Sequence, residues 1–243
     1  MASMSYPLYI LFGVLPSVIW LLFYLRKDVH PEPKSEVIKI FFWGMLIAIP
    51  AVFLEMGIFQ AFGKLGEFFH WSHFLIAIFN IFIGVALIEE VLKYLVVREG
   101  ILKNPEFDEP IDLVLYMIIA ALGFAALENI LILFRLGPAF LFSQALEISA
   151  LRFLGATFLH ALCSGTLGFF LAISFFETSK RRQFFSLGLG ISIVLHGFYN
   201  FSILKIEGPF QFLIPIMILV GLAAFLSFGF KKLKKLKSVC KIE

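Results

Sequence analysis

The sequence predicts an all-α fold, a polytopic membrane helical bundle with about seven transmembrane helices. Hydrophobic residues make up 60% of the 243 residues, charged residues make up 15%, and the mean hydropathy is +0.96. A soluble domain of this size would carry about a quarter charged residues. The apolar runs are continuous and do not alternate with polar residues, which disfavours β-strands. No polar stretch is long enough for a core of its own, so residues 1–243 are expected to form a single integral-membrane domain.

Seven apolar stretches approach or exceed the length of about 20 helical residues that crosses a bilayer. In chain order they are Tyr6–Leu25, Ile38–Phe62, His73–Val97, Ile111–Phe134, Ile148–Phe176, Phe184–Leu204 and Pro209–Phe230. Basic residues follow the first stretch instead of preceding it, which predicts an uncleaved helix. Glu55 in the second stretch is interpreted as a packing or interfacial group. Asp112 lies at the start of the fourth, where a helix favours an acid.

The chain's 20 Lys and Arg residues lie mainly in alternate connections between these spans. They are dense after the first, third and fifth spans and in a basic tail, residues 231–243, whereas the opposite connections hold only Lys64, Arg135 and Lys205. Cytoplasmic connections of membrane proteins carry an excess of Lys and Arg. We therefore expect the N-terminus outside, the C-terminus in the cytoplasm and the tail close to anionic lipids.

Three ionisable residues, Glu89, Glu90 and Lys93, lie in the third span, which is otherwise apolar apart from Asn80. Each costs roughly 2.5–3.5 kcal/mol at a helix centre, so such groups pair, line a watery cavity or do chemistry. Lys93 is four residues from Glu89 and three from Glu90, so it can pair with either carboxylate. A buried ion pair that fixes helix packing is one interpretation. Two carboxylates and one ammonium leave an uncompensated charge, which favours a functional role.

Three later spans also carry polar side chains. Each of these side chains has either a functional role or a structural one, in which it hydrogen-bonds one helix to another. They are Glu128 and Asn129 in the fourth span, His160 with Cys163 and Ser164 in the fifth, and His196, Tyr199 and Asn200 in the sixth. His196 and Asn200 are four residues apart, which places both on one helical face. They can therefore address one small site together.

Two glutamates, histidines and an asparagine in a dry setting suit the hydrolysis of an amide bond. This reaction needs an activated water, donors for the developing oxyanion and a proton for the leaving amine. A buried Glu can act as the general base and then as the acid, and a His–Asn pair can supply the oxyanion donors. Neither a Gly-x-Ser-x-Gly nor a His-Glu-x-x-His motif is present. Ser164, one turn after His160, is the weaker alternative as a serine nucleophile.

Four elements in this order resemble the PrsW family of prokaryotic integral-membrane proteases, which are similar to the CAAX prenyl endopeptidases and the bacteriocin-processing enzymes. The elements are Glu89-Glu90-Val-Leu-Lys93, Phe124-Ala-Ala-Leu-Glu128-Asn129, His160 and His196-Gly-Phe-Tyr-Asn200. They fall within residues 73–204, the expected protease-like core. The resemblance implies a metal-independent glutamic endopeptidase of the cell membrane, without a cofactor, that cleaves a membrane-anchored protein such as an anti-sigma factor.

The resemblance also implies roles for individual residues. Either Glu89 or Glu90 activates the water, and His196 with Asn200 holds the oxyanion. The CAAX-type relatives have a His four residues after the Phe of the second motif, where this chain has Glu128. The His partner of the water is therefore unassigned, and His160 is a candidate. The basic residue of the first motif is also displaced by one position, which disfavours the processing of prenylated tails.

The depths of the residues along their spans do not agree with one shared site. Glu89 lies about 24 Å along the third span from His73, and Glu128 about 26 Å along the antiparallel fourth span, at 1.5 Å per residue. Either the third span starts later and tilts, or Glu128 lies apart from Glu89. Glu128 therefore ranks below the other candidate catalytic residues.

Two other classes of function fit the same residues. A proton-coupled transporter could use Glu89, Glu90 and Glu128 as a proton relay, although no inverted repeat is visible to support it. A metal site could use His160, His196 and a Glu, which are suitable zinc ligands, but their spacings match no short zinc motif. We expect no nucleic-acid partner.

Overall fold

The computed structural model describes residues 6–27, 30–102, 109–135 and 142–235, and no strand occurs among them. Its helices are α1 (Tyr6–Leu25), α2 (Lys34–Phe69), α3 (His73–Phe79), η1 (Asn80–Leu87), α4 (Ile88–Gly100), α5 (Pro110–Arg135), α6 (Phe142–Leu154), α7 (Ala156–Phe176), η2 (Thr178–Lys180), α8 (Arg181–Lys205) and α9 (Phe210–Leu233). Seven of the described helical segments are long and apolar enough to cross a membrane. The all-α fold and the seven spans are therefore confirmed.

Several predicted span boundaries differ from the structure, among them those of the second and fifth spans. The second span runs from Lys34 to Phe69 instead of Ile38–Phe62, and its 36 residues make a helix about 54 Å long at 1.5 Å per residue. The fifth span begins at Phe142, before the predicted Ile148, and it is broken at Gly155. A Cβ atom at Gly155 would collide with the Tyr199 hydroxyl, so glycine at this position admits both the break and the approach of α8.

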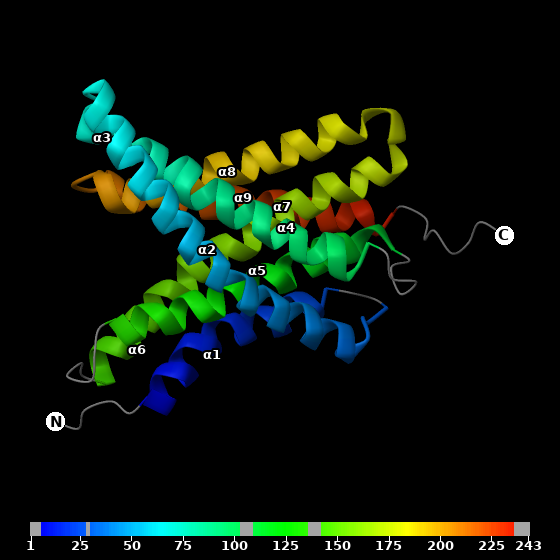
Figure 1. Cartoon of the computed structure of the whole chain (residues 1–243). Coiled ribbons are helices and arrows are strands. Elements are labelled where there is room, and N and C mark those ends of the chain that lie inside the picture. Colours follow the sequence, from blue (N-terminus) through cyan, green and yellow to red (C-terminus); the bar gives the residue numbers. More distant parts are fainter. Residues whose placement is uncertain (1–5, 28–29, 103–108, 136–141, 236–243) are drawn as a thin grey trace.

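Helix α5 is the centre of the bundle (Figure 1), and every residue from Pro110 to Ala126 is buried. Glycines allow its neighbours to approach closely. A Cβ atom on Gly44 of α2 would collide with the Ala120 carbonyl of α5, and one on Gly168 of α7 would lie 2.7 Å from the Leu113 carbonyl. Small residues at such contacts are typical of transmembrane helix packing. They hold α2 and α7 against the helix that carries Glu128.

The third span is one continuous helical rod whose middle, η1, is a π-helix. Its i→i+5 hydrogen bonds change the register between α3 and α4, so a uniform 3.6-residue period does not describe the faces of this span. The π-helix ends at Leu87, two residues before Glu89. Such segments are frequent at functional sites.

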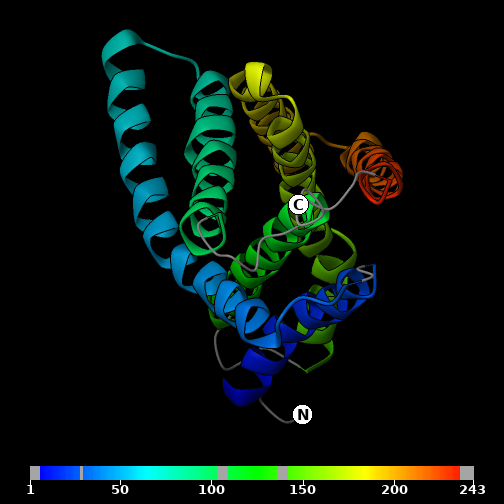
Figure 2. The ribbon, with the colours of Figure 1, turned by 90° about the vertical axis from the view of Figure 1, so that its right-hand side faces the viewer.

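The basic segments gather at one end of the bundle. The ends of α1, α4 and α9 and the starts of α2 and α8 all lie on the right in Figure 1. Figure 2 looks onto that end and shows α9 at the periphery. This arrangement agrees with the alternation expected for seven spans, while the side of the membrane that this end faces stays a prediction. Of the predicted basic tail, residues 236–243 lie outside the described residues.

Candidate active site

The Lys93 ammonium group is the hub of a buried cluster formed by α4, α5, α7 and α8. Its Nζ donates hydrogen bonds to Glu89 Oε2 at 3.0 Å, to Glu90 Oε1 at 2.9 Å and to His160 Nδ1 at 2.7 Å. It also lies 4.6 Å from the centre of the Phe124 ring, a cation–π contact. Lys93 thus pairs with both glutamates at once and links them to α7.

His160 connects the lysine to Glu128. Because an ammonium group can only donate, His160 Nδ1 accepts from Lys93, and the ring proton is then on Nε2. That Nε2 lies 3.0 Å from Glu128 Oε2 and donates to it. The neutral ring is thus held in one tautomer by partners on two other helices.

The two glutamates differ in how many of their oxygens are engaged. Glu90 is fully buried, with Oε1 accepting from Lys93 and from His196 Nδ1 at 3.0 Å and Oε2 accepting from the Ser164 hydroxyl at 2.8 Å. Glu89 accepts from Lys93 through Oε2, and no described residue hydrogen-bonds its Oε1. One glutamate is therefore saturated and the other has an oxygen available to a water.

Two histidine rings flank Glu89. His160 Nδ1 lies 3.5 Å and His196 Nε2 lies 3.9 Å from Glu89 Oε2. The two rings approach edge to face with their centres 5.2 Å apart. His196 Nδ1 donates its hydrogen to Glu90. In the neutral ring Nε2 is therefore unprotonated, and this nitrogen faces Glu89.

Glu128 belongs to the same cluster, so of the two alternatives the one that set it apart from Glu89 was wrong. It shares His160 with Lys93 and Glu89, and Arg152 Nη2 lies 2.8 Å from its Oε2. The spans cross obliquely instead of running parallel (Figure 1), so distance along a helix does not measure depth. With 31% of its side chain exposed, Glu128 marks the open edge of the cluster.

Two residues near the site were not predicted to belong to it. Arg152 reaches Glu128 because the break at Gly155 turns α6, and its Nε also donates to Asn129 Oδ1. Glu55 on α2, interpreted from the sequence as a packing or interfacial group, is close enough to Glu89 and Glu128 for like-charge repulsion. Both are charged residues inside predicted spans, and this alone could have marked them as candidates for the site.

Asn200 is the one predicted site residue without a place in this network. It is half-buried one turn after His196 on α8, and its side chain makes no hydrogen bond to a described residue. Its amide group is consequently available to another molecule.

Comparisons with known proteins find the family described as PrsW family intramembrane metalloprotease, which matches residues 32–227. The chain belongs to this family. It is 32% identical to Protease PrsW of Geobacillus kaustophilus over 80% of this chain and 79% of that one. It is 28% identical to Protease PrsW of Bacillus subtilis over 93% and 94% of the two chains. No solved structure matches.

Membership of the PrsW family makes this chain a membrane peptidase and a multi-pass protein of the cell membrane. The predicted family, enzyme class and location are thereby confirmed. The comparisons give no support to the transporter alternative. The roles of the individual site residues stay predictions.

The description of the PrsW family names a metalloprotease, whereas the sequence-based expectation was a metal-independent enzyme. Glu89, His160 and His196 are buried, and one ligand atom of each lies within 4.8 Å of the others. Carboxylates hold the opposite ring nitrogen of both histidines, as is usual for metal-bound imidazoles. These donors fit a zinc ion in kind and spacing, provided that Lys93 gives up its bond to His160.

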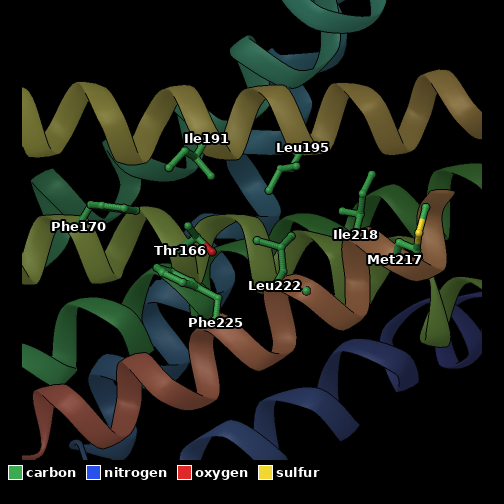
Figure 3. Close-up of a pocket in the computed structure, with 9 residues that line it drawn as sticks. Thr166, Phe170, Ile191, Leu195, Met217, Ile218, Leu222 and Phe225 are labelled. Atoms are coloured by element: carbon green, nitrogen blue, oxygen red, sulfur yellow. The ribbon is translucent and has the colours of Figure 1, made fainter.

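A neighbouring cavity of about 420 Å³ between α7, α8 and α9 does not contain this chemistry (Figure 3). Ile191 and Leu195 of α8 point into it, and Thr166 is the one polar side chain among the described residues that line it. The Thr166 hydroxyl donates to the Leu162 carbonyl of its own helix. The cavity therefore offers apolar contact only.

Proposed function

We propose that this intramembrane peptidase cleaves a membrane-anchored protein with a water molecule that Glu89 activates. The observation that carries the proposal is the contrast between the saturated Glu90 and the available Oε1 of Glu89. Glu89 is buried, with 4% of its surface exposed, beside two histidines and a lysine. A general base needs an oxygen within hydrogen-bond reach of the water, and Glu89 offers one.

The proposed reaction has two proton transfers. Glu89 Oε1 takes a proton from the water while the water oxygen attacks the peptide carbonyl carbon. When the tetrahedral intermediate collapses, the carbon–nitrogen bond breaks and protonated Glu89 delivers its proton to the leaving amine. Neutral His196, through Nε2, accepts a hydrogen bond from the other O–H of the water and so orients it. General acid–base catalysis of this kind contributes about 10²–10⁴-fold.

Lys93, Glu90 and His160 are positioning residues in this proposal. Lys93 fixes Glu89 Oε2, which leaves Oε1 for the water, and Glu90 fixes the ring of His196. His160 and Glu128 hold Lys93 from the other side. A base held by packed partners loses little entropy when it reacts.

We assign the role of oxyanion donor to Asn200 alone, whereas the sequence-based expectation gave it to His196 and Asn200 together. The Nδ1–H of His196 is committed to Glu90, whereas the Asn200 amide has no protein partner among the described residues. Removing one such donor costs about 10²–10³-fold in kcat in a well-studied protease.

A metal ion is the second candidate for activating the water, favoured by the donor set of Glu89, His160 and His196. These three residues would hold it, and a bound zinc ion would supply Lewis-acid activation of the water. Glu90 and Glu128 would then orient the two histidine ligands. We propose an anti-sigma factor or a similar membrane-anchored regulator as the substrate in either case.

The test is cleavage of a membrane-anchored peptide library by the purified full-length protein in detergent. Glu89→Gln should lower cleavage by about 10²–10⁴-fold while the protein stays folded, and cleavage near the parent rate in this variant would reject the proposal. Activity that a chelator removes and zinc restores would identify the metal-dependent mode. Activity unchanged by the chelator, with no metal detected by elemental analysis, would identify the glutamic mode.

A further inference from the structure

A second cavity, of about 510 Å³, lies between α1 and α9 at the end of the bundle where the basic segments gather. Trp20 and Tyr24 of α1, Phe158 of α7, and Leu226 and Phe230 of α9 supply its apolar lining. The Trp20 indole stacks on the Phe158 ring with centres 4.1 Å apart, so the floor is a rigid aromatic surface. Figure 2 faces this end of the bundle, where α1 and α9 end.

Three lysines form the rim of the cavity. Lys27 follows the end of α1, and Lys231 and Lys234 lie at the end of α9. Among the described residues, no carboxylate lies within ion-pair distance of any of them. Three cations from two helices, separated in sequence by about two hundred residues, therefore converge without a counter-ion among the residues that the structure describes.

The α9 lining follows one face of the helix. Ala223, Ser227, Lys231 and Lys234 succeed one another at spacings of four, four and three residues, which is the period of a single helical stripe. Lys232, in the last turn of α9, and Lys235, just after its end, do not line the cavity. The charge of the α9 end is thus divided between a face towards the cavity and a face away from it.

We infer that this cavity binds one anionic phospholipid, with its phosphate between Lys27, Lys231 and Lys234. An acyl chain lies on the aromatic floor, parallel to the spans. The three lysines are at the helix ends, where the head groups of a bilayer lie. The aromatic floor is further along the helices, where the acyl chains lie. Basic pockets between transmembrane helices bind anionic head groups by this combination. The lipid joins α9 to α1 and α7.

The test measures lipid binding to the delipidated full-length protein by native mass spectrometry and by the shift in melting temperature. Phosphatidylglycerol is compared with phosphatidylcholine of the same acyl chains and with inorganic phosphate. We expect saturable stabilisation by phosphatidylglycerol alone. Equal stabilisation by phosphatidylcholine would overturn the inference, because this lipid carries no net negative charge. Equal stabilisation by inorganic phosphate would also overturn it, because phosphate has no acyl chain.

A matched pair of variants separates a built site from general surface charge. K231Q/K234Q should weaken phosphatidylglycerol binding by roughly 25-fold, at about fivefold per lysine, and K232Q/K235Q by less than about twofold. Both variants lose the same charge from the same end of α9, one residue on the helix and one just after it. Equal effects of the two would show that only the surface potential matters, and the inference would then be wrong.

Ala223→Phe tests the acyl-chain part with all lysines kept. Its ring would fill the cavity beside the aromatic floor, so the variant should lose phosphatidylglycerol binding. Its melting temperature without lipid should match that of the parent protein, which separates loss of the site from misfolding. Unchanged binding in this variant would exclude the cavity as the site.

Discussion

The two halves of the buried cluster differ in how completely their polar atoms are paired. On the inner side, Glu90 and Lys93 have no exposed surface, and the hydrogen bonds of Glu90 extend to Ser164 and His196 on two other helices. On the outer side, Glu89 has an oxygen without a described partner, and the Glu128 side chain is 31% exposed. Adjacent glutamates in the sequence thus occupy unlike environments.

This difference separates structure from chemistry within one cluster. A buried network in which every polar atom is hydrogen-bonded contributes mainly rigidity, because each atom is the required partner of another. An unsaturated acid at the edge of such a network is held in place but can still accept a proton. The inner side therefore acts as the support, and we propose the outer side as the reactive group.

The largest expected effect comes from Glu89→Gln. Cleavage of a membrane-anchored peptide should fall by about 10²–10⁴-fold, since the base is lost. The matched variant Glu90→Gln should lower activity by less, about 10–100-fold, as is usual for a residue that orients another. It should lower the melting temperature more than Glu89→Gln does. The reverse order in both measurements would break the distinction between the two glutamates.

Lys93→Met should destabilise the protein most. It leaves two carboxylates without their shared cation, and breaking a buried ion pair costs about 3–5 kcal/mol. The measurement is reversible unfolding in detergent with added denaturant. Lys39→Met serves as the control, because Lys39 forms a partly exposed pair with Glu36. If the two variants unfold alike, the inner side is not the support inferred above.

Asn200→Ala should reduce kcat by about 10²–10³-fold if its amide donates to the oxyanion. Its melting temperature should stay close to that of the parent protein, since the side chain bonds to no described residue. A stability loss without an effect on kcat would move Asn200 to a structural role. It would also leave the oxyanion donor to a different residue.

Ser164→Ala should have the smallest effect. It removes one hydrogen bond to the charged Glu90, which contributes about 1.5–3 kcal/mol, and the loss should appear in unfolding. Peptide cleavage should continue with only a modest change in rate. Complete loss of cleavage in a folded variant would instead support the serine-nucleophile alternative.

Much of the fold could be predicted because each transmembrane helix must satisfy its backbone hydrogen bonds internally. Length and hydropathy alone therefore located the seven spans. The break at Gly155 and the π-helix before Glu89 could not be predicted in this way. Both depend on contacts with other helices, such as the Tyr199 hydroxyl that occupies the space beside Gly155.

The sequence by itself determined the class of protein, the spans and the polar residues that cost energy inside them. Only the tertiary structure decided how those residues pair. Glu89 and Glu90 are equivalent in sequence terms, and both are within reach of Lys93. They diverge because Ser164 and His196, on helices far along the chain, hydrogen-bond to Glu90 and not to Glu89. Such partners are fixed by the crossing of helices, which no local pattern of residues encodes.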